Sequence, residues 1–406
     1  MGSPRYVIDE SALKRNLEIL KGVSDRTGAK ILLAQKAYSC AATYPLCAKY
    51  LAGTTASSLF EARHGHDFFG GETHVFAPAF AEEEMDEILG IVDHIVFNSP
   101  RQVALFGARA RERGVSVGLR VNPEVSVATT PAYDPCRPSS RLGTTRAAFN
   151  AAFPRSQFPI PRSPFPIPRS PFPIPRSPFP ILDGLHFHCL CEQGVDELKK
   201  VLAGFEEKFG DLLPVVRWVN FGGGHHITRK NYDVKALVTL INDFRSRHPQ
   251  LEVYLEPGEA VALNAGTLES RVLEIQPTGP DGVANAILDT SAACHMPDVL
   301  EMPYTPRVVG ASIHDPSSPN PVPHSSFLYR FGGPTCLAGD EIGTYSFPHP
   351  LKEGDVVVFE DMAIYSMVKN NTFNGLNLPE IAIRHDDGSV ETLRTFGYSD
   401  FATRLG

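Results

Sequence analysis

Short apolar runs recur along the first two thirds of the chain and are separated by longer stretches in which apolar and polar residues alternate with a helical period. Short apolar runs bounded by turn residues are typical of buried strands, whereas amphipathic stretches of ten or more residues are typical of helices. The first five runs start 20–23 residues apart, which is the spacing of strand-helix units. The eight runs are Ile31–Gln35, Thr54–Ser57, His74–Ala77, His94–Phe97, Ser116–Val121, Gly184–His188, Val216–Phe221 and Glu252–Leu255.

The stretches between these runs predict helices, for example over Glu10–Gly22, where leucines recur every three or four residues, and over residues 81–90 and 101–114. Strands that alternate with helices form parallel sheets, and eight such units close into a barrel. The predicted fold class is therefore α/β, a (β/α)8 TIM-type barrel over residues 10–262.

From residue 263 onward the helical pattern stops, and strand-like runs with turn signals take its place. We expect residues 263–406 to form a second, all-β domain of the sandwich or barrel-like kind. The opening RYVIDE is also strand-like, and we expect residues 1–9 to pair with this second sheet.

A seven-residue unit, FPIPRSP, interrupts the barrel region at residues 154–180. Proline lacks the backbone N–H group, so this density of prolines excludes helix and inner strand. The repeat is either a tandem duplication tolerated in a surface loop, which we favour, or a proline-rich docking peptide.

Composition and charge exclude several classes of protein. The 406 residues are 42% hydrophobic and 21% charged, as in ordinary globular proteins, and the net charge of −8 gives no overall attraction to nucleic acid or anionic lipid. No apolar run approaches a membrane span, and the N-terminus has no signal-peptide pattern. Seven scattered cysteines suit reduced thiols, so we expect a cytoplasmic protein without a membrane or nucleic-acid partner and without a metal site.

Four polar features follow the apolar runs and carry the candidate chemistry. Lys36 follows the first run, His188 ends the sixth, Gly222, Gly223 and Gly224 follow the seventh, and Glu256 ends the eighth. Barrels of this kind carry their chemistry at the carboxyl ends of the strands, so we expect all four on one face. An amine, an aromatic face, a glycine cradle and a carboxylate are what pyridoxal 5'-phosphate requires.

Each feature alone has a structural interpretation as well. Most lysines are solvated, glycine runs are more often plain turns, His188 could be a satisfied core histidine, and Glu256 could begin a helix. The glycines lack both GxGxxG spacing and a following Lys-Ser/Thr, so nucleotide binding is not expected. The occurrence of all four features in one predicted barrel favours the cofactor.

The segments ILLAQKAYS, GLHFHCLCE, NFGGGHH, YLEPGEAV and FGGPTCLAGD resemble, in this order, the signature segments of fold-type III pyridoxal-phosphate decarboxylases. Residues 292–304 and 361–375 are especially similar to the group that decarboxylates carboxynorspermidine and carboxyspermidine. The resemblance spans nearly the whole chain except residues 154–180. It implies release of CO2 from a carboxylated polyamine, giving norspermidine or spermidine.

The resemblance also implies a role for individual residues. Lys36 would hold the cofactor covalently, His188 would stack on its ring, Gly222–Gly224 and Tyr365 would bind its phosphate, and Glu256 would face its pyridine nitrogen. Cys336, contributed by the partner subunit of a homodimer, would reprotonate the α-carbon after CO2 leaves. By composition alone, Cys336 would be a buried structural thiol.

The substrate residues are less specific. Asp298 and Glu301 are candidates for the cationic polyamine tail, and Arg141 for the substrate carboxylate, although each also suits a solvated or structural ion pair. Two positions depart from related enzymes. Glu259 stands where ornithine decarboxylase-like enzymes have arginine, and Cys189 stands where we expect asparagine.

Three other functions remain open at this point. The chain could be a decarboxylase of the same fold acting on diaminopimelate, ornithine or arginine. It could be a catalytically silent homologue that binds pyridoxal phosphate or a protein partner, because fold does not imply function. It could also serve mainly as a scaffold through its proline-rich repeat.

Overall fold

The computed structural model describes residues 4–153, 182–315 and 327–406 of the chain. The proline-rich repeat at residues 154–180 lies outside the described residues. The described chain divides into two compact units, one taking its residues from 17–36 and 40–261, the other from 1–16, 37–39 and 262–406.

The first unit is a closed barrel of eight parallel strands, in which each strand pairs with the next in sequence and the last pairs with the first. This confirms the predicted fold class and all eight predicted strands. A closed sheet has no unpaired edge strand. Only the two ends of the barrel are therefore not closed off by strand pairing. The strands are β2 (Lys30–Ala34), β3 (Gly53–Ala56), β4 (Glu72–Phe76), β5 (His94–Phe97), β6 (Ser116–Arg120), β7 (Gly184–His186), β8 (Trp218–Asn220) and β9 (Glu252–Leu255).

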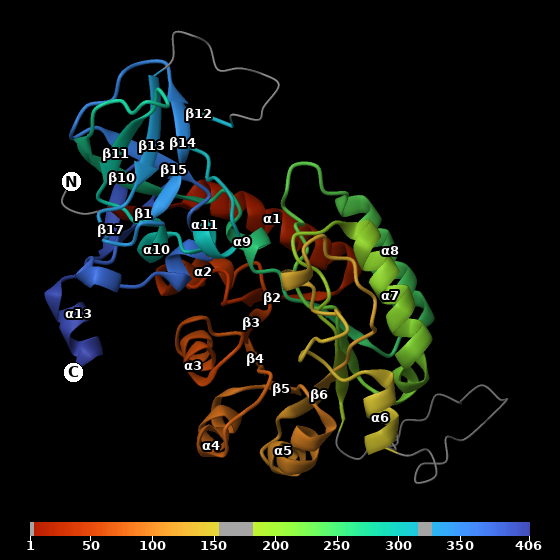
Figure 1. The fold of residues 1–406 in the computed structure, drawn as a ribbon. Coiled ribbons are helices and arrows are strands. Elements are labelled where there is room, and N and C mark those ends of the chain that lie inside the picture. The colour runs from red at the N-terminus through yellow and green to blue at the C-terminus, as the bar shows by residue number, and fades with distance from the viewer. Residues whose placement is uncertain (1–3, 154–181, 316–326) are drawn as a thin grey trace. The chain divides into compact units, whose positions relative to one another are not determined.

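Helices lie outside the barrel, between successive strands (Figure 1). The predicted helices are present, and the first extends beyond its predicted end to Thr27. The helices of this unit and of the chain entering it are α1 (Glu10–Thr27), α2 (Tyr44–Cys47), α3 (Leu59–Phe68), α4 (Glu82–Ile91), α5 (Pro100–Glu112), α6 (Arg146–Ala152), α7 (Val195–Phe209), α8 (Val234–Arg247) and α9 (Glu259–Ala262), with 3-10 turns at Ala41–Thr43, Pro131–Tyr133 and Gly210–Val215.

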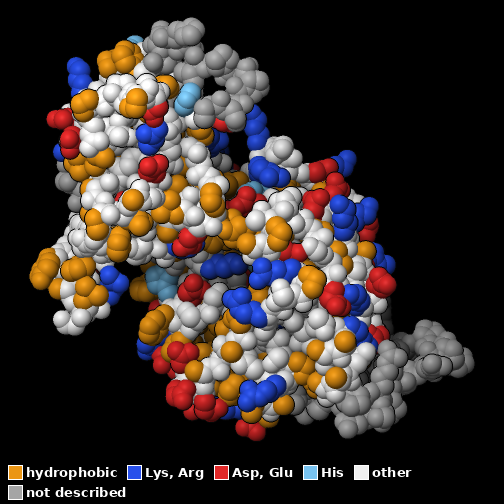
Figure 2. Space-filling view, in the orientation of Figure 1, with side chains coloured by type: hydrophobic (Ala, Val, Ile, Leu, Met, Phe, Trp, Pro, Cys, Tyr) orange, Lys and Arg blue, Asp and Glu red, His pale blue; other side chains and the backbone are white. Residues whose placement is uncertain are grey.

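Local sequence explains where several of these helices begin. Ser58, Ser99, Thr145 and Asp233 each cap a helix with a side-chain oxygen that accepts from a backbone N–H. Helix α4 has no such cap, but its first turn carries three glutamates, whose charges interact favourably with the positive end of the helix dipole. Figure 2 shows acidic side chains gathered in this part of the surface.

The interior of the barrel is filled by large side chains around Trp218, which packs with Leu32, Val96 and Tyr254. Two glycines make room for the indole ring. A Cβ atom on Gly184 would lie 2.0 Å from the Trp218 ring, and one on Gly118 would lie 2.3 Å from it. The barrel is therefore a packed core rather than a pore, and its chemistry must lie at one of its ends.

The second unit is built on a nine-stranded sheet in which β15 pairs with β10 beside the main path. Its first strand, β1, pairs antiparallel with β10 and parallel with β16, so the predicted pairing of the N-terminal segment with the second sheet is confirmed. The strands are β1 (Arg5–Asp9), β10 (Gly266–Ile275), β11 (Ala284–Leu288), β12 (Ser312–Ile313), β13 (Phe327–Gly332), β14 (Glu341–Phe347), β15 (Val356–Glu360), β16 (Glu380–Arg384) and β17 (Val390–Arg394).

This unit is mainly sheet, but it is not all-β. Its described residues also form four short helices, α10 (Ala292–His295), α11 (Asp298–Glu301), α12 (Ser366–Lys369) and α13 (Tyr398–Leu405), and a 3-10 turn at Phe373–Gly375. Three of the helices are only four residues long, which is too short to produce a readable helical period in the sequence. No helix among the described residues is long and apolar enough to cross a membrane.

Candidate functional site

The four polar features predicted from the barrel pattern lie at the same end of the barrel. Lys36 follows β2, His188 follows β7, and the glycines and Glu256 follow β8 and β9. Two hydrogen bonds from backbone N–H groups join these strand ends. The Glu256 N–H donates to the Gly222 carbonyl at 2.8 Å, and the Gly223 N–H donates to the side-chain Nδ1 of His188 at 3.2 Å. Parallel strands thus bring residues 220 positions apart into one site.

The three glycines after β8 are required by close packing. Gly222 has a φ of +72°, and a Cβ atom there would lie 2.5 Å from the Phe187 carbonyl oxygen. A Cβ atom on Gly223 would lie 2.2 Å from the Glu256 carbonyl oxygen. Within the described chain the Gly224 N–H has no acceptor. A tight glycine turn with a spare N–H donor suits a phosphate group.

Glu256 is buried, and its two oxygens have separate partners. Asn220 Nδ2 donates to Oε1 at 2.7 Å, and His186 Nε2 lies 3.4 Å from Oε2. Burial alone would raise the pKa of Glu256, but the facing His186 and Asn220 outweigh it and hold the pKa at about 2. The carboxylate is therefore ionised at neutral pH and can face a protonated ring nitrogen.

Lys36 is accessible to solvent although protein surrounds it on most sides. This partial desolvation lowers the pKa of Lys36, the charge of Arg120 lowers it further, and Glu256 opposes both. A lowered pKa increases the fraction of neutral amine at physiological pH, which is the form that attacks an aldehyde. Lys36 therefore suits covalent attachment of a carbonyl cofactor.

His188 is half-buried beside this lysine. Burial lowers its pKa well below the ordinary value, and the positive charges of Lys36 and Arg120 lower it further, so the imidazole is neutral. Because its Nδ1 accepts from the Gly223 N–H, the ring proton belongs on Nε2. A neutral ring held by its edge leaves its face for stacking on an aromatic cofactor.

Arg120 was missed by the sequence analysis because it lies inside the predicted strand Ser116–Val121, whereas β6 ends at Arg120. It is 5% exposed, donates from Nη2 to the His188 carbonyl at 2.9 Å, and lies 4.6 Å over the Phe76 ring. An arginine at the carboxyl end of a barrel strand was the available signal. Arg120 fixes the strand end that carries His188 and adds positive charge near Lys36.

The remaining predicted residues belong to the second unit, except Arg141. Tyr365 has a φ of +49°, which is unusual for a residue with a side chain, and its N–H donates to the Ala37 carbonyl at 2.8 Å. Ala37 directly follows Lys36 in the sequence. The Tyr365 backbone therefore contacts Ala37, the residue that follows the candidate cofactor lysine in the chain.

Cys336 is an exposed thiol, not the buried structural one that composition alone favours. Its N–H and its Sγ both lie against Asn374 Oδ1, at 3.1 Å and 3.3 Å. Asn374 itself has a φ of +55°, within a 3-10 turn. This amide oxygen orients the thiol proton while the sulfur stays accessible, which is what a proton donor to an external carbon requires.

Asp298 and Glu301, on α11, both pair with the Lys369 ammonium group. Burial alone would lower the pKa of Lys369, but the hydrogen bonds and charges of the two carboxylates outweigh it and raise it. Asp298 is 7% exposed, whereas Glu301 is exposed. The two residues predicted to bind an amine thus form a site that already holds one.

Arg141 is exposed in the loop that follows β6. Its carbonyl accepts from Asn98 Nδ2 at 2.9 Å, and its positive charge lowers the pKa of Arg120 after the larger effect of burial. Arg141 therefore adds positive charge near Arg120. This charge suits an anionic substrate group.

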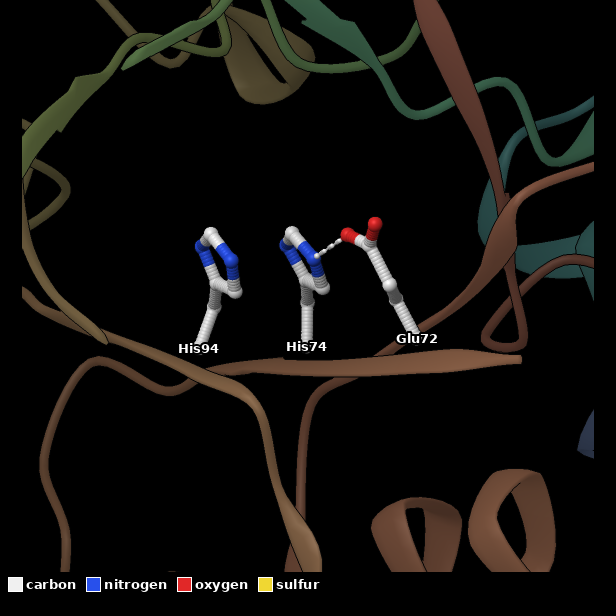
Figure 3. A group of neighbouring side chains, drawn as sticks. All are labelled: Glu72, His74 and His94. Atoms are coloured by element: carbon white, nitrogen blue, oxygen red, sulfur yellow. Dashed lines mark hydrogen bonds and ion pairs between the residues drawn. The ribbon is translucent and has the colours of Figure 1, made fainter. Parts of the chain in front are cut away.

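A second cluster of ionisable side chains, Glu72, His74 and His94, lies at the amino ends of β4 and β5 (Figure 3). The two imidazole rings stack with centroids 4.0 Å apart and planes within 7°, so their ring nitrogens point in parallel directions and do not converge on one ion. Glu72 is already paired with Lys30 Nζ at 2.7 Å. These contacts favour a charge network at the end of the barrel opposite Lys36.

A family model described as "Pyridoxal-dependent decarboxylase, C-terminal sheet domain" matches residues 5–363. The chain is 38% identical to a carboxynorspermidine/carboxyspermidine decarboxylase of Campylobacter jejuni, over 99% of this chain and 98% of the relative. It is equally identical, 38%, to a carboxyaminopropylagmatine decarboxylase of a Synechocystis species, over 100% of this chain and 95% of the relative.

Solved structures agree with these matches. The crystal structure of Campylobacter jejuni carboxynorspermidine decarboxylase in complex with norspermidine superposes with a TM-score of 0.86 at 37% identity, covering 100% of both chains. Helicobacter pylori diaminopimelate decarboxylase, at 16% identity and a TM-score of 0.78, shares the fold, and the match covers 100% of this chain and 97% of the other. The chain with Lys36 and Glu256 at one barrel end belongs to the pyridoxal-dependent decarboxylase family.

Proposed function

We propose that this protein removes CO2 from carboxynorspermidine and carboxyspermidine and so forms norspermidine and spermidine. The observation that carries the proposal is the combination of an accessible Lys36 of lowered pKa with an ionised Glu256 at one end of the barrel. Relatives at 36–38% identity that carry the corresponding names support this choice of substrate.

Pyridoxal phosphate, when bound, supplies a ring that accepts the electron pair released as the carboxylate leaves. Lys36 would hold its aldehyde carbon, Gly222–Gly224 and Tyr365 its phosphate, and the face of His188 its ring. Glu256 keeps a proton on the pyridine nitrogen because its own pKa of about 2 leaves the carboxylate charged. The chain thereby fixes the charge distribution that favours loss of CO2.

The acidic pair Asp298 and Glu301 would recognise the polyamine tail. Its carboxylates already hold the Lys369 ammonium, so an ammonium group of the substrate has a ready-made binding geometry there if Lys369 moves aside. Arg141 would bind an anionic end of the substrate. These assignments require a substrate with a carboxylate at one end and amines at the other.

A substrate panel tests the proposed function. We expect CO2 release by the pyridoxal-phosphate-loaded protein from carboxynorspermidine and carboxyspermidine, measured beside carboxyaminopropylagmatine, diaminopimelate, ornithine and arginine. Carboxyaminopropylagmatine is the second candidate, because one 38%-identical relative bears that name. Release from diaminopimelate, ornithine or arginine alone would contradict the proposal, and no release from any compound would favour a silent homologue.

We further propose a cytoplasmic homodimer in which Cys336 of one subunit completes the site that contains Lys36 of the other. The seven cysteines are all free thiols, which suits a reducing compartment. The Cys336 thiol is exposed and oriented by Asn374, so it is available to a neighbouring subunit. In this role its proton is transferred to the α-carbon after CO2 leaves.

Mixing two inactive variants tests the shared site. Lys36→Ala and Cys336→Ala proteins are expected to be strongly impaired separately. When dissociated and reassociated together, half of the dimers carry one intact site, so about a quarter of wild-type activity should return. The same mixture kept undissociated is the control. No recovery, with subunit exchange verified by mass, would contradict a site shared between subunits.

A further inference from the structure

The side chain of Asn220 joins two parts of the candidate site. Asn220 is the last residue of β8 and is 0% exposed. Its Nδ2 donates to Glu256 Oε1 at 2.7 Å, and its Oδ1 accepts from the Gly222 N–H at 2.8 Å. One buried amide therefore contacts both the carboxylate proposed to face the pyridine nitrogen and the first glycine of the turn proposed to bind the phosphate.

The orientation of this amide follows from its two partners. An ionised carboxylate can only accept a hydrogen bond and a backbone N–H can only donate one, so the amide nitrogen must face Glu256 and the amide oxygen must face Gly222. An ionised aspartate could not donate to Glu256, and an aliphatic side chain could bond to neither partner. Asparagine satisfies both partners without adding a charge to the site.

The pleat of the strands places Asn220 in the interior of the barrel. Alternate residues of a strand face the same side of the sheet. Trp218 packs with Tyr254 inside the barrel, and Asn220 and Glu256 follow these two residues by two positions each. The amide and the carboxylate therefore form the layer next to the packed core, at the end of the barrel that carries Lys36.

The backbone fixes the strand ends but leaves the Glu256 side chain free to rotate. The Glu256 N–H donates to the Gly222 carbonyl at 2.8 Å, which sets the register of the two segments. The carboxylate is then oriented by its own contacts, with Asn220 Nδ2 at 2.7 Å from Oε1 and His186 Nε2 at 3.4 Å from Oε2. Asn220 makes the shorter of these two contacts.

We propose that Asn220 is a positioning residue that couples the two ends of the bound cofactor. By holding Glu256 and the Gly222 N–H on one amide, it fixes the distance between the carboxylate that faces the pyridine nitrogen and the turn that binds the phosphate. Because the amide is neutral, the negative charge of this layer stays on Glu256. This inference rests on the proposed function, which supplies the positions of the nitrogen and the phosphate.

Binding of pyridoxal phosphate to the full-length protein, from which the cofactor has first been removed, is the direct test. Asn220→Leu keeps a similar side-chain size but removes both hydrogen bonds. We expect the Kd of the cofactor to rise by about 10-fold or more, because a hydrogen bond to a charged group is lost and the Gly222 N–H is left unpaired. The absorbance of the bound cofactor gives the Kd.

Asn122 provides a matched control at the same end of the barrel. It follows β6, is 5% exposed, and its Oδ1 likewise accepts from the N–H two residues later, that of Glu124, at 2.7 Å. Its Nδ2, however, donates to the Leu142 carbonyl and not to a carboxylate. Asn122→Leu should therefore lower the thermal stability but leave the cofactor Kd close to that of the wild type. An equal rise of the Kd in both leucine variants would overturn the proposal.

Asn220→Asp separates the two hydrogen bonds and remains informative if Asn220→Leu folds poorly. The aspartate can still accept from the Gly222 N–H, but it faces a second carboxylate, and two carboxylates at hydrogen-bond distance share one proton. At low pH the shared proton replaces the amide donor, whereas its loss as the pH rises leaves two negative charges in contact. The ratio of the variant Kd to the wild-type Kd should therefore be close to one at pH 6 and rise several-fold by pH 9. A constant ratio over this range would overturn the proposal.

Other groups also influence Glu256 electrostatically, and the comparison with the wild type accounts for them. Both proteins carry the same neighbours, so the ratio of the two Kd values removes the effect that these neighbours have in common. The charged and titratable neighbours are His186, His74, Lys36 and Arg120.

The NMR resonance of an isotope-labelled ring nitrogen in the bound cofactor separates this inference from the proposed function. We expect a protonated nitrogen in the wild type and in Asn122→Leu, and a resonance shifted toward the unprotonated form in Asn220→Leu, because Glu256 is no longer held in place. An unchanged resonance in Asn220→Leu would contradict the positioning role. An unprotonated nitrogen in the wild type would refute the proposed role of Glu256 and this inference with it. The expected Kd values and resonances without CO2 release would refute only the proposed reaction.

Discussion

Replacing Lys36 by alanine is expected to abolish decarboxylation, lowering kcat by about 10³-fold or more, as when a residue that binds a reacting group covalently is removed. The Lys36 side chain carries an accessible amine at the carboxyl end of the barrel strands. Burial by the surrounding protein and the charge of Arg120 both lower its pKa. Loss of this side chain removes the attachment point for the cofactor aldehyde. The measurements are CO2 release and the absorbance of bound pyridoxal phosphate.

Lys30 provides a matched control on the same strand. It begins β2, whereas Lys36 follows the end of that strand, so the two lysines lie at opposite ends of the barrel. Lys30 pairs with Glu72 at 2.7 Å, and its replacement by alanine should cost about 1 kcal/mol of folding free energy or less, because the side chain is partly exposed. Cofactor binding should persist. Near-normal turnover by the Lys36 variant would contradict the assignment of Lys36.

Replacing Glu256 by glutamine is expected to lower kcat by about 100-fold or more, the loss that follows removal of one preorganised electrostatic group. The amide keeps the size of the side chain and can still accept from Asn220 Nδ2, so the fold should remain. It carries no negative charge to retain a proton on the pyridine nitrogen. Steady-state kinetics and thermal unfolding, measured together, separate the loss of charge from loss of structure.

Glu252 is the corresponding control on β9. It begins the strand that Glu256 follows and is exposed, so Glu252→Gln should leave kcat close to that of the wild type. An equal loss of kcat in both glutamine variants would argue against a specific role for Glu256.

The pH dependence of stability gives an independent test of Glu256. Its pKa in the folded protein, about 2, lies below the ordinary value of 4.5, so ionised Glu256 stabilises the fold above pH 4.5. This contribution declines as the pH falls from 4.5 to about 2. We therefore expect the difference in stability between the wild type and Glu256→Gln to be constant from pH 6 to 8 and to decrease below pH 4.5. A difference that changes between pH 6 and 8 would contradict the depressed pKa.

The barrel strands were readable because each buried strand is a short apolar run and the runs recur at a regular spacing. The same pattern located Lys36, His188 and Glu256, since a polar residue that ends an apolar run in a parallel barrel must lie at the carboxyl end of its strand. The short helices α10, α11 and α12 were not readable, because four residues make barely one helical turn.

Arg120 was missed because the apolar run extends to Val121, which placed Arg120 inside the predicted strand, whereas β6 ends at Arg120. Its partner, the His188 carbonyl, lies 68 positions further along the chain. This contact does not follow from local propensity, because it depends on the neighbouring strands β6 and β7, which a long connection joins.

By itself the sequence determined the strand order of the barrel, the end at which its polar residues gather, and the kind of cofactor those residues suit. These follow from hydrophobic periodicity and from the fixed direction of parallel strands, which are local properties. The tertiary structure alone decided the ionised state of Glu256, the lowered pKa of Lys36, and the pairing of Asp298 and Glu301 with Lys369. Those properties depend on burial and on charges brought together by folding, which no stretch of sequence contains.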